Sequence, residues 1–314
     1  MSKSVLILGA NGRFGRNAAA AFSWANWNVT RFDRATDTLP DAAWGADIII
    51  NAWNPAYPDW ARIVPELTAQ VIDTAKDTGA TVLIPGNIYN YGTDMPAELR
   101  ESTPHNPTSP LGQIRNDMEQ SYRDARVRTI VLRAGDFIDT SASGNWYDKV
   151  ITAKLGKGLV DYPGNLDVPH AWAFLHDLAD AAVMLCDKAA ELPVFFEANF
   201  PGYTLTAREL HHAIEQATGR RLMLREMPWW PVKLARPFWP TAKPLLEMQY
   251  LWDTPHSIVS ERLGELLPDF APTPLHEAIA ASLPDHIDPN GKVARSSCPI
   301  KRPFNFCCPN AKTT

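Results

Sequence analysis

The chain has 314 residues, 45% of them hydrophobic, which is enough for one large domain or two interlocked domains with a buried core. Its formal net charge of −5 argues against a protein that binds nucleic acid through a basic surface. Because no apolar run approaches the roughly 20 residues that cross a bilayer, we expect no membrane-spanning helix.

The opening apolar run begins at Val5, which leaves no room for a signal peptide, so we expect a cytoplasmic protein. The cysteines agree with that location. Cys186 lies in an apolar helical run and is expected to be a small buried thiol. Cys298, Cys307 and Cys308 lie in a basic tail without metal-ligand spacing, so we expect no metal site.

The segment that follows the first apolar run is typical of a dinucleotide-binding turn. Residues 5–8 are apolar, residues 9–15 read Gly-Ala-Asn-Gly-Arg-Phe-Gly, and residues 17–22 are rich in alanine. This order predicts a strand, a tight turn and a helix, and the helix N-terminus presents free N–H groups to a pyrophosphate. A glycine turn with a purely structural role is the less favoured interpretation. The predicted phosphate-binding residues are Gly9, Asn11, Gly12, Arg13, Phe14 and Gly15.

Apolar runs then alternate with helical segments through the first half of the chain, a rhythm that predicts a parallel sheet covered on both faces. The expected fold class is α/β, a Rossmann-type doubly wound sheet with a smaller C-terminal substrate-binding lid region. The strands are expected at residues 4–8, 28–32, 47–51, 81–84, 128–133 and 194–198, and the helices at 57–78, 112–125 and 207–218.

The second half of the chain is richer in proline and tryptophan, at residues 228–231 and 237–240. We expect it to form a lid over the carboxyl edge of the sheet, where open α/β folds bind ligands. Its tryptophans at 229, 230, 239 and 252 are expected mainly to pack, with a substrate pocket or an interfacial patch as alternatives. The expected division is a dinucleotide-binding domain at 1–160, completed by about 176–200, a mainly substrate-binding region at 161–287, and a disordered tail at 288–314.

The acid that selects the dinucleotide is expected after the second strand. Asp33 stands 18 residues beyond Gly15, close to the spacing of the carboxylate that bonds the adenosine ribose. A carboxylate there repels a 2′-phosphate and favours NAD. Arg34 and Arg13 keep NADP open, because a guanidinium binds phosphate well, although both could instead be solvated or stack on adenine.

Taken together, the ordered motifs resemble the short-chain dehydrogenase/reductase superfamily over about residues 3–285, in its extended or atypical branch, which includes the NAD-dependent epimerase/dehydratases. The resemblance implies that the backbone after the third strand passes along the cofactor, so Asn51, Ala52 and Trp53 are predicted cofactor contacts. The matching pieces are residues 9–15, Asp33, residues 47–53, 88–92, 107–119, 132–136 and 176–180.

The family's catalytic residues are replaced in this chain. The resemblance implies a Ser or Thr after the fourth strand and a Tyr-x-x-x-Lys pair at the start of the next helix. Here Asn87, in the segment Pro85-Gly86-Asn87, stands at the first position, Leu111 at the Tyr position and Arg115 at the Lys position. Pro85 and Arg115 are also predicted cofactor contacts. Leu111 has no ionisable proton, and Arg115 stays charged, but Arg115 could still anchor the nicotinamide ribose and Asn87 could bond a substrate oxygen.

Few side chains could replace the missing proton donor. Tyr89 and Tyr91 follow the fourth strand near the expected nicotinamide, although packing is the commoner role for such residues. His105 lies in a loop, and His170 could face the substrate cleft or be a hydrogen-bonded structural histidine. Asp177 is expected to cap the helix that begins at Leu178.

Two hypotheses follow for function. The first is an NAD(P)-dependent oxidoreductase, epimerase or dehydratase that acts on a small carbonyl- or hydroxyl-bearing molecule, with Asn87, Tyr89, Tyr91 and Arg115 as candidate catalytic residues. Quinones and enones need no strong acid and fit the missing Tyr better than sugars do. The second is a non-catalytic NAD(P)-binding sensor or assembly protein. A membrane-surface reductase is a third and less favoured alternative, and a homodimer through the helices at 57–78 and 112–125 is possible.

Overall fold

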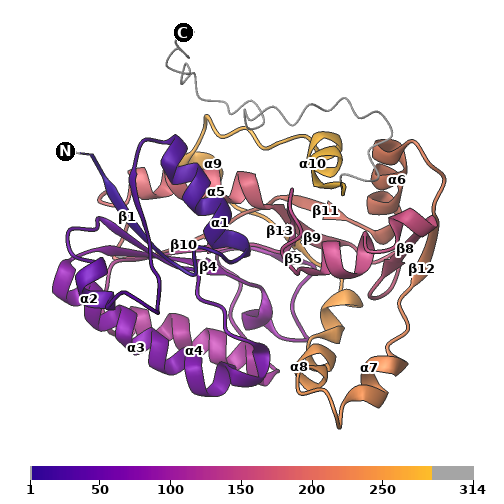
Figure 1. The fold of residues 1–314 in the computed structure, drawn as a ribbon, viewed down its shortest axis with the longest axis horizontal. Coiled ribbons are helices and arrows are strands. Elements are labelled where there is room, and N and C mark those ends of the chain that lie inside the picture. Colours follow the sequence, from indigo (N-terminus) through magenta and orange to yellow (C-terminus); the bar gives the residue numbers. More distant parts are fainter. Residues whose placement is uncertain (1, 285–314) are drawn as a thin grey trace.

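The computed structural model describes residues 2–284, and a central sheet of six parallel strands organises them (Figure 1). The strand order across the sheet is β10-β6-β4-β3-β1-β2. The expected α/β fold is confirmed, and each strand lies within about two residues of its expected position. The strands are β1 (Ser4–Leu8), β2 (Asn28–Arg31), β3 (Ile48–Asn51), β4 (Thr81–Gly86), β6 (Thr129–Arg133) and β10 (Phe195–Asn199).

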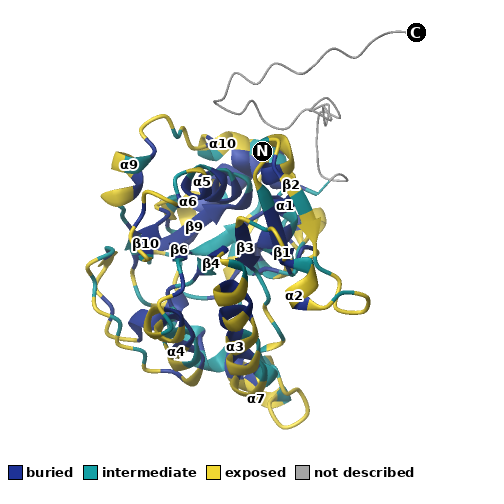
Figure 2. Cartoon of the chain, turned by 90° about the vertical axis from the view of Figure 1, so that its left-hand side faces the viewer, coloured by how far each residue is buried: buried dark blue, intermediate teal, exposed yellow. Residues whose placement is uncertain are grey.

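Helices cover both faces of this sheet (Figure 2). α1 (Arg13–Trp24) packs against α5 (Leu175–Asp187) on one face, and α3 (Trp60–Thr78) packs against α4 (Pro110–Asp124) on the other. Side chains alternate along each strand, so Val5 and Ile7 of β1 join the core under α1 and α5. Leu6 and Leu8 join the core under α3 and α4.

The strand order reverses direction between β1 and β3. In open α/β sheets the ligand crevice lies at this reversal, outside the carboxyl ends of the strands. Residues 32–47 connect β2 to β3 with only the single-turn helix α2 (Leu39–Ala42), so β2 forms the edge of the sheet. The reversal therefore directs the search for a site to the segments that follow β1, β2, β3 and β4.

The remaining elements include three small sheets, ordered β11-β9-β7, β12-β8 and β13-β5. The first two surround a third core, whereas Leu99 and Ile258 of the β13-β5 sheet join the core under α3 and α4. Their strands are β5 (Glu98–Leu99), β7 (Asp136–Ile138), β8 (Leu159–Tyr162), β9 (His170–Phe174), β11 (Tyr203–Leu205), β12 (Met223–Glu226) and β13 (Ser257–Ile258). The helices are α6 (Ala207–Thr218), α7 (Trp230–Ala235), α8 (Ala242–Glu247), α9 (Arg262–Leu266) and α10 (Leu275–Ser282). Short helical turns are η1 (Tyr57–Asp59), η2 (Tyr89–Tyr91), η3 (Tyr147–Ile151), η4 (Leu155–Lys157) and η5 (Gln249–Trp252).

The N-terminus of α6 is capped by neighbouring residues as expected, whereas that of α5 is not. α6 spans the expected residues: Thr206 and Glu209 form a reciprocal capping box, and Gly219 ends the helix in the left-handed region. The expectation that Asp177 caps α5 is wrong. Phe174 precedes the helix, and the Asp177 carboxylate instead accepts hydrogen bonds from the N–H and the hydroxyl of Thr273, at 2.7 and 2.6 Å.

Two further expectations concern the ends of the chain and membranes. The tail expected at 288–314 lies outside the described residues. Within residues 2–284, no helix combines the length and the apolar character that crossing a membrane requires. Cys186 is buried, as expected, and burial raises the pKa of its thiol.

A buried ion network joins the carboxyl ends of the central strands. Arg133, at the end of β6, is fully buried and bonds Glu119 of α4 and Glu197 of β10, each at 2.7 Å. Burial alone would raise the pKa of Glu197, but Arg133 and His105 together hold that pKa down, at about 2. The network therefore clamps α4 and β10 to the strand between them.

We predict that Arg133→Ala lowers the free energy of unfolding by about 3 to 5 kcal/mol, because it leaves two buried carboxylates without their cation. Arg100→Ala is the matched control, since Arg100 makes solvent-exposed ion pairs with Glu98 and Glu261 and its loss should change stability little. Urea unfolding followed by circular dichroism measures both. Equal effects of the two substitutions would contradict a stabilising role for the network.

Candidate functional site

The glycine turn after β1 is shaped by contacts between backbones. Gly9 has a φ of +76°, and a Cβ added to it would lie 2.7 Å from the carbonyl oxygen of Ala52, after β3. A Cβ on Gly15 would lie 2.2 Å from the carbonyl oxygen of Gly9. Both positions therefore require glycine. Gly12 differs, because a Cβ there would meet only Gly9 O, at 3.1 Å, and its extended backbone suits any residue.

The N-terminus of α1 opens from this turn toward solvent. Gly12 precedes the helix and no side chain caps it, so the first main-chain N–H groups are available to an anion. Asn11 and Gly12 are exposed, whereas the Phe14 side chain is buried in the core and can offer only its main chain. No acidic residue lies in the first turn, which leaves the positive end of the helix dipole uncompensated.

Cationic side chains surround the helix N-terminus. Arg13 donates from Nε to the carbonyl oxygen of Ser143 at 3.2 Å and from Nη2 to that of Gly144, so it ties the loop after β7 to the turn. Lys149 lies beside the same loop, where a Cβ on Gly144 would be 3.2 Å from its Cε. Arg16 is neutralised by the buried Asp139, at 2.6 Å. Arg13 is therefore a bridging residue rather than a freely solvated one.

The segments after β2 and β3 meet beside the turn. Asp33 is exposed, and its carboxylate accepts the N–H of Ala35 at 2.9 Å, which holds the loop in a tight turn. The Arg34 guanidinium lies over the Trp53 ring at 4.2 Å, and Phe32 packs edge-on against the same ring at 5.6 Å. These contacts form a platform of aromatic and cationic side chains with a carboxylate at its rim.

Asn51 and Ala52 immediately precede Trp53, and Asn51 contacts α4. Asn51 donates from its side-chain amide to the Tyr122 hydroxyl at 3.0 Å, and its Oδ1 is buried with no partner among residues 2–284. Arg115 Nε is likewise buried with no partner in that part of the chain, and both residues line one small space together with Trp53. Asn51 and Arg115 therefore border the same space beside the segment after β3.

Leu111 and Arg115, which stand at the Tyr and Lys positions of α4, have different environments. Leu111, at the Tyr position, is 3% exposed and belongs to the core, so it offers no group to a substrate. Arg115, at the Lys position, lies over the Trp60 ring at 4.3 Å and donates to Asn54 Oδ1 at 2.9 Å. Burial lowers its pKa, and the nearby Glu119 works in the opposite direction. Arg115 is a fixed cation at the edge of the site.

Next to Arg115 lie two tyrosines whose hydroxyls are hydrogen-bonded. The Tyr57 and Tyr89 oxygens are 2.8 Å apart, and both residues are half-buried. Burial raises the pKa of Tyr57, and burial together with the neighbouring Tyr57 and Asp136 raises that of Tyr89 well above its ordinary value. Arg115 acts against both increases. The pair therefore holds two protons beside a cation, in reach of the carboxyl end of β4.

The other candidates after β4 have different environments. Asn87 Oδ1 accepts the N–H of Tyr89 at 3.0 Å, so its side-chain oxygen is used within its own turn, and Pro85 is half-buried at the end of the strand. Tyr91 is 2% exposed, and burial raises its pKa to about 12. Because its hydroxyl is buried and has no partner within the described part of the chain, Tyr91 contributes to packing and not to an accessible site.

The candidate histidines are part of the surrounding structure. His170 is 1% exposed, bonds Asp136 at 2.9 Å and stacks on Trp252 at 4.3 Å, so it is the hydrogen-bonded histidine that we expected as an alternative. Its neighbour His256 has a pKa lowered to about 3, chiefly by burial. The ligand atoms of His105, Glu119 and Glu197 lie within 4.8 Å of one another, and Arg133 already bonds both carboxylates, so these side chains form an ion network.

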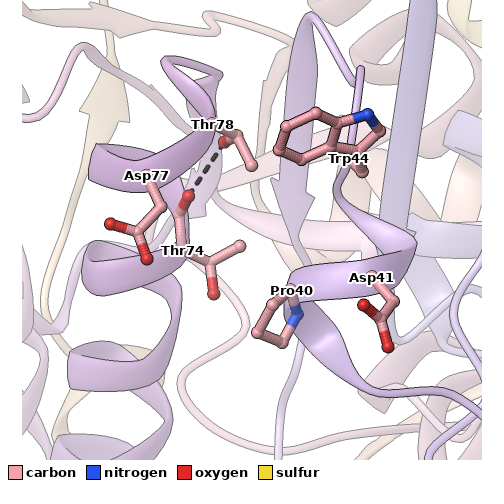
Figure 3. Close-up of a pocket in the computed structure, with 6 residues that line it drawn as sticks. All are labelled: Pro40, Asp41, Trp44, Thr74, Asp77 and Thr78. Atoms are coloured by element: carbon pink, nitrogen blue, oxygen red, sulfur yellow. Dashed lines mark hydrogen bonds between the residues drawn. The ribbon is translucent and has the colours of Figure 1, made fainter.

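A surface depression away from these residues lies between α2 and α3 (Figure 3). It is lined by six residues, Pro40, Asp41, Trp44, Thr74, Asp77 and Thr78. Thr78 is the last residue of α3, which precedes β4, so the depression lies toward the amino ends of the strands. It is therefore separate from the glycine turn.

Sequence reasoning missed Tyr57, Asn54, Trp60, Lys149 and Asp136. Asn54 and Tyr57 follow β3 directly, and this position after a parallel strand was the signal that could have identified them. Lys149 and Asp136 come from segments that only the folded chain brings to the turn and to the tyrosine pair.

No protein-family model matches the chain, and no curated protein matches its sequence. Solved structures do resemble it. MoeE5 in complex with UDP-glucose and NAD has a TM-score of 0.69 and 16% identity, over 90% of this chain and 97% of that chain. UDP-glucose 4-epimerase from Bifidobacterium longum, in complex with NAD+ and UDP, has a TM-score of 0.68 and 17% identity, over 92% and 100%. RMD from Pseudomonas aeruginosa, complexed with NADPH, has a TM-score of 0.67 and 16% identity, over 90% and 98%.

These likenesses extend over 90–92% of this chain and 97–100% of the matched chains. The protein therefore shares its overall fold with these structures. The fold that the motif order indicated is confirmed.

Proposed function

We propose that this protein binds NAD(P) at the turn after β1 and acts as an oxidoreductase or epimerase on a small carbonyl- or hydroxyl-bearing substrate. The observation that carries the proposal is the glycine cradle at the N-terminus of α1, placed at the point where the strand order reverses. The similar structures hold NAD or NADPH in a fold of this kind, which supports the same assignment here.

The residues of this chain suit the parts of a dinucleotide. The uncapped α1 N-terminus and the cations Arg13 and Lys149 would hold the pyrophosphate. The platform of Trp53 and Arg34 would contact the adenosine, and Asp33 at its rim would bond the ribose hydroxyls. Because that carboxylate is exposed and repels a 2′-phosphate, we favour NAD, while the adjacent Arg34 leaves NADP as the alternative.

In this proposal the tyrosine pair, Tyr57 and Tyr89, takes the role of proton donor that the Tyr-x-x-x-Lys pair has in the resembling family. Bound NAD(P) would supply or accept the hydride. In the reduction direction, Tyr89 would donate its proton to the substrate oxygen, and Tyr57 would pass its own proton to Tyr89 through their 2.8 Å hydrogen bond. Solvent water would then reprotonate Tyr57. The cation of Arg115 favours negative charge on Tyr89 as its proton leaves. Since the raised pKa values make both tyrosines weak acids, carbonyls that accept hydride readily, such as quinones and enones, fit best.

One observation favours a second candidate, a dinucleotide-binding protein without chemistry. Leu111 fills the position of the catalytic Tyr with a core side chain. A sensor or assembly protein would keep the cradle and lose turnover. The two candidates share the binding site and differ only in whether hydride leaves the cofactor.

We predict that Gly12→Val weakens NADH binding at least about a hundredfold, about 2.7 kcal/mol, because its side chain enters the space for the pyrophosphate. The fold should persist, since an added Cβ meets only Gly9 O. Gly264→Val is the control, because a Cβ on Gly264 in α9 meets nothing within 4 Å. NADH fluorescence titration and thermal unfolding measure binding and stability. Unchanged binding in Gly12→Val would reject the site.

We predict that Tyr89→Phe lowers kcat by about 10²- to 10⁴-fold without changing NADH affinity, since it removes only the proton donor. Tyr91→Phe is the control, because its buried hydroxyl has no partner among the described residues and faces no substrate. Loss of reduced-nicotinamide absorbance over a panel of quinones, enones, aldehydes and UDP-sugars measures turnover. Tight binding with no turnover by the parent on any of them would favour the sensor.

A further inference from the structure

The segment that joins the small β12 strand to η5 projects from the body of the protein. Figure 1 shows α7 and α8 side by side at one edge, joined by a turn at the extreme of the ribbon. We call residues 230–243, which comprise α7, this turn and the start of α8, the aromatic-basic tip. None of its residues is used in the proposed function.

Large apolar side chains on the tip face solvent. Phe238 is 90% exposed, Leu234 71%, Trp230 67% and Trp239 43%. Trp230 and Leu234 are four residues apart in α7, so they lie on the same face of the helix. A single exposed apolar residue needs no explanation, but four within ten residues form a patch of the kind that marks an interaction site.

Cations accompany these apolar residues without any acid between them. Lys233, Arg236 and Lys243 are exposed, and none of them forms an ion pair within residues 2–284. Residues 227–246 contain no Asp or Glu, in a chain whose overall net charge is −5. The tip is thus a local positive region on an acidic protein.

Several main-chain positions in the turn of the tip have no N–H group left for water to bind. The N–H groups of Phe238 and Trp239 both donate to the carbonyl oxygen of Ala235, at 2.9 and 2.8 Å. Pro237 and Pro240 have no N–H group that would need a partner. Internal pairing of donors lowers the cost of moving a turn out of water.

Buried residues anchor the tip to the body. Trp229 is 9% exposed, packs against Trp146 at 5.8 Å and donates from its indole nitrogen to the carbonyl oxygen of Pro163. Ala242 is fully buried at the start of α8. Trp229 and Trp230 are neighbours in sequence, yet one holds the segment and the other faces outward. The exposure is therefore a property of a fixed structure.

We propose that the aromatic-basic tip docks this protein on an anionic lipid bilayer surface. Trp, Phe and Leu side chains insert at the boundary between headgroups and acyl chains, and Lys and Arg bind anionic headgroups. A second copy of the chain fits less well, because a two-fold contact through the tip would bring the same three cations together. The proposal does not depend on NAD(P) binding.

Co-sedimentation of the full chain with large unilamellar vesicles tests the proposal, using phosphatidylcholine alone and phosphatidylcholine with phosphatidylglycerol. We expect binding to the mixed vesicles, with a blue shift of tryptophan fluorescence, and little binding to phosphatidylcholine alone. Phe238→Ser should weaken partitioning about tenfold. The double variant Lys233→Gln with Arg236→Gln should weaken it about thirtyfold, and added salt should have the same direction of effect.

Trp44→Ser is the matched control, because Trp44 is 84% exposed and lies beside Asp41 in the depression between α2 and α3, away from α7 and α8. It should leave vesicle binding unchanged. Circular dichroism and thermal unfolding confirm that each variant is folded. The proposal is overturned if the parent does not bind mixed vesicles, if both tip variants bind as the parent does, or if Trp44→Ser has the effect of Phe238→Ser. It is equally overturned if the tip proves to be buried in a dimer that Phe238→Ser dissociates.

Discussion

The carbonyl oxygen of Ala52 lies where any side chain on Gly9 would have to be, and the carbonyl of Gly9 excludes a side chain from Gly15 in turn. These contacts between backbones bring the end of β1, the start of α1 and the segment after β3 into one compact turn. Because they occur where the strand order reverses, the free N–H groups of α1 lie at the edge of the sheet where open α/β folds bind ligands. The Trp53–Arg34 pair and the tyrosine pair lie on the segments that follow β2, β3 and β4 at the same edge.

Around this turn, the proposed binding features are more complete than the proposed reactive features. The cradle, the exposed Asp33 and the platform of Trp53 and Arg34 together offer the groups that the proposed dinucleotide site needs. At the start of α4, by contrast, Leu111 is a core side chain and Arg115 is a cation fixed by Trp60 and Asn54. A positive charge beside two protonated tyrosine hydroxyls can still stabilise negative charge on an oxygen. The proposed chemistry therefore relies more on electrostatics than on strong acid.

Local rules predicted much of this structure, and tertiary contacts account for the rest. The glycine turn and the two ends of α6 were predictable because the residues that determine each of them are close together in the sequence. Asp177 looked like a helix cap for the same reason, but Thr273, distant in sequence, takes its carboxylate. Tyr57 and Tyr89 meet only because β3 and β4 are neighbours in the sheet. The opposite environments of Trp229 and Trp230 could not be predicted, since a short helix between prolines has too little periodicity to show which face is buried.

Isothermal titration calorimetry of the unmodified full chain with NAD+, NADH, NADP+ and NADPH tests the central claim most directly. The account predicts saturable heat at one site per chain, with tighter binding of the NAD pair because Asp33 opposes a 2′-phosphate. Absence of heat with all four coenzymes, together with an unchanged thermal midpoint in their presence, would contradict it.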